Sequence, residues 1–127
     1  MAKLEHVNVT VQAPLKTAEV LCGLFDWKIR WQGPAKMGGF TVHVGTAEQY
    51  LALFAPPAGL NGPVDPGLYQ SGLNHIGIVV DDLDLCERRI LAAGYKTESH
   101  ADYEPGRRFY FTEENGVEIE VVSYAAR

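Results

Sequence analysis

The sequence predicts an α+β fold of two tandem βαβββ modules, which we expect to form a cupped mixed sheet around a metal site. Two observations predict it. A strand and helix pattern recurs at an offset of 68 to 69 residues, and a histidine stands at the same place in each copy. The 127 residues suffice for one domain. It comprises module one at about residues 4–55, a linker at about 56–72 and module two at about 73–124.

The first strand of each module shows the repeat most clearly. Residues 4–11 (LEHVNVTV) and 73–80 (LNHIGIVV) both alternate apolar and other side chains with a period of two. His6 and His75 occupy the same position in the two copies, on the strand face opposite the β-branched side chains. The segment between the modules is rich in proline and glycine, which predicts a connecting loop.

Helices and shorter strands complete each module. Apolar residues at helical spacing predict a helix that starts near Pro14 and a second one capped by Asp81 or Asp82. Further strands are expected at about residues 28–32, 40–45, 50–55, 96–100, 107–112 and 117–124, with Gly38-Gly39 and Asn115-Gly116 as turns.

A metal site is the chemistry that this repeat indicates. Glu120 lies between Ile119 and Val121 in the last strand, so its side chain points away from the core. Two imidazoles (His6 and His75) and one carboxylate suit a divalent ion such as Fe, Mn, Zn or Ni. Each of these residues alone is more simply a surface or structural residue, but the internal repeat favours the ligand interpretation.

Composition excludes several kinds of partner. A net charge of −5 argues against nucleic acid. The absence of an apolar run of about 20 residues argues against a membrane span. The first residues do not resemble a signal peptide, so we expect a cytoplasmic protein.

The paired modules, the histidine at the head of each first strand and the ending Asn115-Gly116 through Val121 resemble the vicinal oxygen chelate superfamily over about residues 4–124. This superfamily includes glyoxalase I, fosfomycin-resistance thiol transferases, methylmalonyl-CoA epimerase, extradiol dioxygenases and bleomycin-resistance proteins. The resemblance implies the fold and the position of the metal. It does not select one reaction, because the superfamily supports several.

The resemblance also implies roles for individual residues. His6, His75 and Glu120 match the metal ligands, whereas Ala52 stands where glyoxalase I and the epimerase have a further ligand. The three-ligand pattern resembles extradiol dioxygenases and fosfomycin-modifying enzymes, and Tyr110 has the spacing of an active-site tyrosine in both. No histidine stands in residues 50–55 to supply the extra acid–base group of a dioxygenase. The phosphonate-binding cluster of the fosfomycin enzymes is not recognisable.

Three further residues are candidates for the site. His43 is either a general base facing the cavity or a hydrogen-bonded strand histidine. Arg108 either binds a substrate carboxylate or phosphate, or is an ordinary surface charge at the start of a strand. For Trp31 we expect packing in the core or in a dimer.

These residues lead to a functional hypothesis with one alternative. We expect a metal-dependent enzyme, dioxygenase-like or lyase- or transferase-like, acting on a small oxygen-rich substrate chelated to the ion, with Tyr110 and His43 handling protons. The alternative is a small-molecule binding or antibiotic-resistance protein that sequesters its ligand. Many two-module relatives are homodimers, so a homodimer is expected, and the site lies either within one chain or across two.

Overall fold

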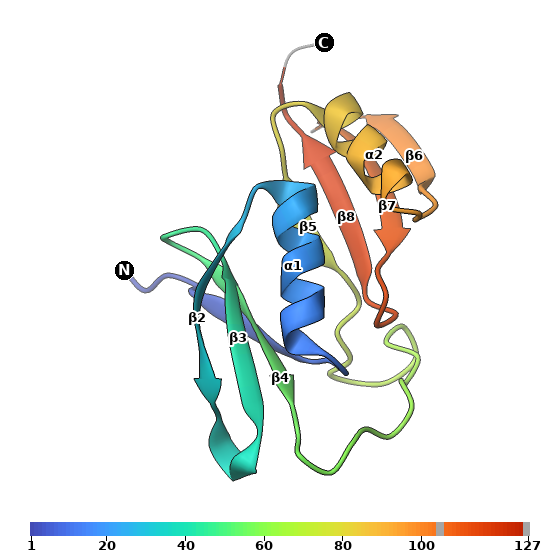
Figure 1. Cartoon of the computed structure of the whole chain (residues 1–127). Coiled ribbons are helices and arrows are strands. Elements are labelled where there is room, and N and C mark those ends of the chain that lie inside the picture. The colour runs from blue at the N-terminus through green and yellow to red at the C-terminus, as the bar shows by residue number, and fades with distance from the viewer. Residues whose placement is uncertain (104–105, 126–127) are drawn as a thin grey trace. The chain divides into compact units, whose positions relative to one another are not determined.

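Each half of the sequence folds as a βαβββ unit in the computed structural model, which describes residues 1–103 and 106–125 (Figure 1). The chain divides into two units, Met1–Asn61 and Gly62–Arg127. The first contains β1 (His6–Thr10), α1 (Pro14–Phe25), β2 (Lys28–Pro34), the 3-10 turn η1 (Lys36–Gly38), β3 (Phe40–Gly45) and β4 (Tyr50–Ala55). The second contains β5 (Ile76–Val79), α2 (Leu83–Ala92), β6 (Glu98–Tyr103), β7 (Gly106–Thr112) and β8 (Glu118–Ser123).

The first sheet has the strand order β1-β4-β3-β2, with β1 parallel to β4 and the other pairs antiparallel. Val42 and Val44 of β3 are fully buried, and so is Ala18 of α1, the helix that covers one face of this sheet (Figure 1). His43, which alternates with the two valines, therefore lies on the face that α1 does not cover.

The second sheet repeats this arrangement with the order β5-β8-β7-β6. Phe109 and Phe111 of β7 are fully buried together with Ile90 of α2. Arg108 and Tyr110 alternate with the two phenylalanines and lie on the opposite face. The strands thus form two four-stranded mixed sheets, one per unit, which confirms the predicted α+β fold of two tandem βαβββ modules.

The first, third and fourth strands of the two units share the same register. Asn8 pairs with Ala52 in the first unit, and Gly77 pairs with Glu120 in the second, so Ala52 is the counterpart of Glu120 as predicted. On the neighbouring strands, His43 pairs with Ala52 and Tyr110 pairs with Glu120. His43 is therefore the counterpart of Tyr110, a relation that the sequence repeat did not reveal.

Local signals in the sequence account for the element boundaries. Pro14 is the first residue of α1, and Asp82 caps α2 by accepting a hydrogen bond from the Leu85 backbone N–H at 3.0 Å, as expected. The Asn115-Gly116 turn forms, with Gly116 at φ 83°. The buried Glu113 carboxylate accepts backbone N–H bonds there from Asn115 (2.8 Å) and Val117 (3.1 Å).

The structure differs from two expectations about β-strand residues. β6 begins at Glu98 instead of residue 96 and contains a bulge, with Ser99 at φ 56°. Trp31 does not pack in the core, because 51% of its surface is exposed, and its packing in a dimer stays a prediction.

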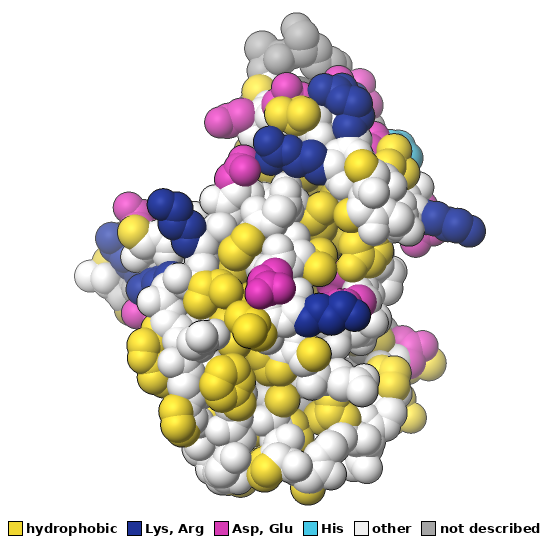
Figure 2. All heavy atoms as spheres, in the orientation of Figure 1, with side chains coloured by type: hydrophobic (Ala, Val, Ile, Leu, Met, Phe, Trp, Pro, Cys, Tyr) yellow, Lys and Arg dark blue, Asp and Glu magenta, His cyan; other side chains and the backbone are white. Residues whose placement is uncertain are grey.

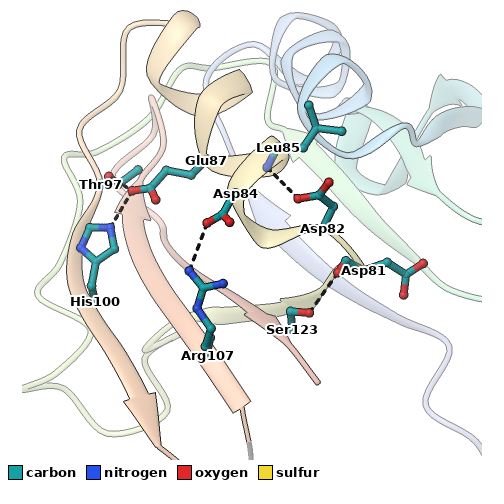
Figure 3. Close-up of polar contacts among 9 residues, drawn as sticks. All are labelled: Asp81, Asp82, Asp84, Leu85, Glu87, Thr97, His100, Arg107 and Ser123. Carbon is teal, nitrogen blue, oxygen red and sulfur yellow. Dashed lines mark hydrogen bonds and ion pairs between the residues drawn. The ribbon is translucent and has the colours of Figure 1, made fainter. Parts of the chain in front are cut away.

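A polar cluster ties α2 to β6 in the second unit (Figure 3). The Glu87 carboxylate accepts hydrogen bonds from the Thr97 hydroxyl and from Nε2 of His100, the latter at 2.6 Å. Burial raises the pKa of Glu87, but the hydrogen bonds from Thr97 and His100 outweigh it, so the pKa lies below its ordinary value. Beside this cluster, Arg107 donates to Asp84 at 3.1 Å (Figure 3).

Replacing Glu87 with glutamine is expected to lower the free energy of unfolding at pH 7 by about 1 kcal/mol. A carboxyl group whose pKa is lowered by folding stabilises the protein above its unfolded pKa, and this contribution disappears as the pH falls through the folded pKa. The difference between Glu87→Gln and the wild type, measured by urea unfolding, should therefore shrink below about pH 4. Glu98→Gln, an exposed change on β6, is the control. A difference that is constant from pH 7 to pH 3 would contradict this account.

The surface of the second unit around α2 carries charges of both signs side by side (Figure 2). Among the described residues, no helix is long and apolar enough to cross a membrane.

Candidate functional site

Glu120 is the centre of a hydrogen-bonded group in the second unit. Its Oε1 accepts a hydrogen bond from the Tyr110 hydroxyl at 2.6 Å, and its Oε2 accepts one from Nη1 of Arg108 at 3.0 Å. The Arg108 and Glu120 side chains are only 12% and 13% exposed. Antiparallel pairing of β7 with β8 sets these contacts, because it places Tyr110 directly opposite Glu120.

His75 completes this group from the residue just before β5. Its Nε2 lies 3.3 Å from Oε1 of Glu120, and its ring meets the Tyr110 ring edge-on, with centroids 5.9 Å apart. The Nδ1–H of His75 donates to Oδ1 of Asn74 at 2.8 Å. This bond fixes the ring and leaves the lone pair on Nε2 in the neutral imidazole, which is the form that binds metals.

Tyr110 stays protonated over the ordinary pH range. The hydrogen bond to Glu120, with burial and the Glu120 charge, raises the pKa of Tyr110 to about 12. The phenol therefore acts as a donor at neutral pH.

Arg108 is held on several sides. Its Nη2 donates to the Gly106 carbonyl at 3.3 Å, and its guanidinium lies 4.9 Å from the centre of the Tyr103 ring. Its Nε is buried without a hydrogen-bond partner among the described residues. Arg108 is therefore not an ordinary surface charge, and the binding of a substrate anion by this side chain stays a prediction.

His6 has a comparable setting in the first unit. Its Nδ1–H donates to Oε1 of Glu5 at 2.9 Å, so here too the preceding residue orients the imidazole and leaves Nε2 available. The hydrogen bond from His6 is the main cause that lowers the pKa of Glu5. His6 also stacks on Tyr50 with ring centroids 4.8 Å apart.

His43 contacts other rings on the uncovered face of the first sheet. It stacks on Tyr50 at a centroid distance of 4.6 Å and meets Trp31 at 5.2 Å. Burial, with the neighbouring charges of His6 and Arg30, lowers the pKa of His43. The imidazole is therefore neutral at pH 7 and able to accept a proton.

The donor atoms present fit a divalent metal ion. Nitrogen and oxygen ligands about 2.1 Å from one ion, at angles between square and tetrahedral, lie about 3.0–3.4 Å apart. The 3.3 Å between Nε2 of His75 and Oε1 of Glu120 falls in this interval. His6 belongs to the other unit, and the described residues contain no cluster of three His, Cys, Asp or Glu side chains arranged to hold a metal.

Sequence reasoning missed the residues that support these candidates. Glu5 and Asn74 each hold the histidine that follows them, and Tyr50 lies between His6 and His43. A signal for the first two was present, because both histidines follow a side chain with an acceptor oxygen. No signal pointed to Tyr50, whose contacts depend on side chains from three strands.

Comparisons with known proteins agree with this architecture. The family model of the Glyoxalase/Bleomycin resistance protein/Dioxygenase superfamily matches residues 3–121. A glyoxylase/bleomycin resistance protein/dioxygenase domain from Frankia sp. EAN1pec has a TM-score of 0.82 at 20% identity, covering 97% of this chain and 98% of that one. No curated protein matches in sequence.

Fosfomycin-resistance proteins are also similar in structure. FosX from Mesorhizobium loti has a TM-score of 0.70 at 18% identity, covering 96% of this chain and 91% of that one. A FosX mutant from Listeria monocytogenes, complexed with Mn(II) and 1S,2S-dihydroxypropylphosphonic acid, has a TM-score of 0.70 at 17% identity, covering 96% and 92%. At these identities the likeness shows the fold alone.

Proposed function

Because the chain belongs to the Glyoxalase/Bleomycin resistance protein/Dioxygenase superfamily, we propose that it is a metal-dependent enzyme acting on a small oxygen-rich substrate. His75 and Glu120 are two ligands of the ion, and His6 is the third, supplied by the same chain or by a second copy in a homodimer. The ion is Fe, Mn, Zn or Ni, which this ligand set accepts. The Mn(II) in the Listeria FosX complex supports a metal-dependent role.

The arrangement of His75 carries this proposal. Its Nε2 lies at a distance from Glu120 that suits two ligands of one ion, and its Nδ1–H is held by Asn74. Nδ1–H bonds of this kind orient metal-binding histidines in many proteins. His6, held by Glu5, has the same orientation device.

The other residues of the site transfer protons or bind negative charge. An ion held by His75, Glu120 and His6 would supply Lewis-acid stabilisation of negative charge on substrate oxygens. The single O–H of Tyr110, which donates to Glu120, turns from Glu120 to the substrate to donate a hydrogen bond or a proton. His43, neutral at pH 7, accepts a proton. Arg108 holds Glu120 in place, and the remaining N–H groups of its Nη1 and Nη2 bind a substrate anion.

The reaction belongs to the dioxygenase-like or the lyase- or transferase-like group. Ala52, the counterpart of Glu120, supplies no fourth ligand. Without a carboxylate there, an isomerisation of the glyoxalase I type lacks its base.

A binding or antibiotic-resistance protein without turnover is the second candidate, and one observation favours it. Both oxygens of Glu120 already have partners, Tyr110 and Arg108, and the guanidinium balances the carboxylate charge without a metal. Metal content separates the two functions.

The purified protein is expected to contain more than about half an equivalent of a transition metal, and His75→Ala to lose most of it. Elemental analysis by mass spectrometry measures both. His100→Ala is the matched control, because His100 lies in the same unit and binds Glu87 instead. A wild-type protein with less metal than this would favour the binding protein. Unchanged metal in His75→Ala would exclude His75 as a ligand.

A further inference from the structure

Four rings form a continuous row on the uncovered face of the first sheet, one ring from each strand. In the strand order β1-β4-β3-β2 they are His6, Tyr50, His43 and Trp31, with neighbouring centroids 4.8, 4.6 and 5.2 Å apart. The hydrophobic core of this unit lies on the other face of the sheet, under α1. The row therefore needs an explanation other than core packing.

Trp31 ends the row as an open platform. The residue two positions on, Gly33, has no side chain, and a Cβ added there would come within 2.8 Å of Cζ2 and 3.1 Å of Cη2 of the indole. The indole thus lies along the backbone of its own strand, in space that any other residue would occupy. Half of Trp31 is exposed, so the ring presents apolar surface to solvent.

Arg30 adds a positive charge to the same face. A bulge between Ile29 and Trp31 inserts Arg30 as an extra residue in β2, and its guanidinium lies 4.3 Å from the centre of the Tyr50 ring. Arg30 forms no ion pair within the described residues, and Glu5, whose charge is nearby, is bound to His6. The N–H groups of Arg30 are therefore open to an anion from outside the chain.

We propose that this face binds a planar aromatic ring that carries a carboxylate, with the ring stacked on Trp31 and the carboxylate on Arg30. Aromatic rings stack favourably on indole, and guanidinium pairs with carboxylate in bidentate geometry. The inference rests on the proposed function, since it names the substrate class for the site to which His6 and His43 belong. It adds that the substrate is an aromatic acid rather than an aliphatic one.

Isothermal titration of the full-length purified protein with three matched probes tests the substrate class. Benzoate has both the ring and the charge, cyclohexanecarboxylate keeps the charge without a planar ring, and benzamide keeps the ring without the charge. Benzoate is expected to bind at least about fivefold more tightly than either of the others. Equal affinity for benzoate and cyclohexanecarboxylate would overturn the stacking, and equal affinity for benzamide would overturn the role of Arg30.

Variants locate the site. Trp31→Ala and Arg30→Gln are each expected to weaken benzoate binding by about five- to tenfold, whereas Lys28→Gln, which removes a charge from the same strand, should have no effect. Circular dichroism checks that each variant is folded.

In nuclear magnetic resonance spectra of the chelator-treated protein, benzoate should shift the indole N–H of Trp31 and leave that of Trp27 unchanged. Wild-type affinity for benzoate in both variants would overturn the proposal. It would also be overturned if the wild type did not bind benzoate and Trp31→Ala changed the oligomeric state.

The metal content of the protein as purified, before any chelator treatment, separates this inference from the proposed function. Benzoate binding that depends on Trp31 and Arg30 in a protein purified without metal would support the aromatic site and contradict the metalloenzyme. Normal metal content with no preference for benzoate would contradict the aromatic site alone.

Discussion

Replacing Glu120 with glutamine is expected to reduce the bound metal to less than about a tenth of an equivalent and to lower the free energy of unfolding by about 2–3 kcal/mol. The first effect follows because an amide is a much weaker metal ligand than a carboxylate. The second follows because Arg108 keeps its charge in a mostly buried position after its partner has lost the opposite one. Glutamine retains an acceptor oxygen, so the loss should be smaller than for alanine.

Elemental analysis and urea unfolding measure the two effects of Glu120→Gln separately. Glu118→Gln is the matched control, because Glu118 is an exposed residue of the same strand. A stable variant without metal would show that Arg108 tolerates an uncompensated charge. Full metal content would exclude Glu120 as a ligand, whatever the stability.

Replacing Phe109 with alanine is expected to lower the free energy of unfolding by about 3–5 kcal/mol, the largest stability effect that we predict. Phe109 has no exposed surface and lies on the core face of β7, directly between Arg108 and Tyr110. The substitution leaves a cavity under the strand that presents both of these residues to Glu120. We therefore expect weaker metal binding as well, although Phe109 carries no donor atom.

Leu91→Ala is the control for Phe109→Ala, because Leu91 is half exposed on α2 and its truncation should cost less than about 1 kcal/mol. Urea unfolding followed by circular dichroism gives both values. Similar losses in the two variants would mean that Phe109 does not pack as tightly as its burial indicates.

The alternation of side chains allowed the fold and the faces of the strands to be predicted from the sequence. Burial of Ile119 and Val121 beside the polar Glu120 is a local property of one strand, and the pattern of apolar residues records it. By contrast, the bulge in β6 rests on Ser99 at φ 56°, a conformation that serine adopts rarely and that no turn signal in the sequence announced.

Contacts between side chains of different strands could not be predicted in this way. The sequence placed Glu120 on the strand face away from the core, but its contacts with Arg108 and Tyr110 depend on neighbours across the sheet. Trp31 lies flat because Gly33 leaves it room, and Arg30 reaches Tyr50 because of a bulge. Tyr50 is distant from Arg30 in sequence, and the room beside Gly33 becomes apparent only with the folded backbone, so the alternation of side chains predicts neither outcome.

The register that the two units share on three strands shows where their lengths differ. Counterpart residues differ by 69 in number on the first strands (Asn8 and Gly77), by 67 on the third (His43 and Tyr110) and by 68 on the fourth (Ala52 and Glu120). The change from 69 to 67 matches the helices, which have 12 and 10 residues. The two copies therefore differ in length between the strands, whereas the first, third and fourth strands keep the same cross-strand neighbours in both units.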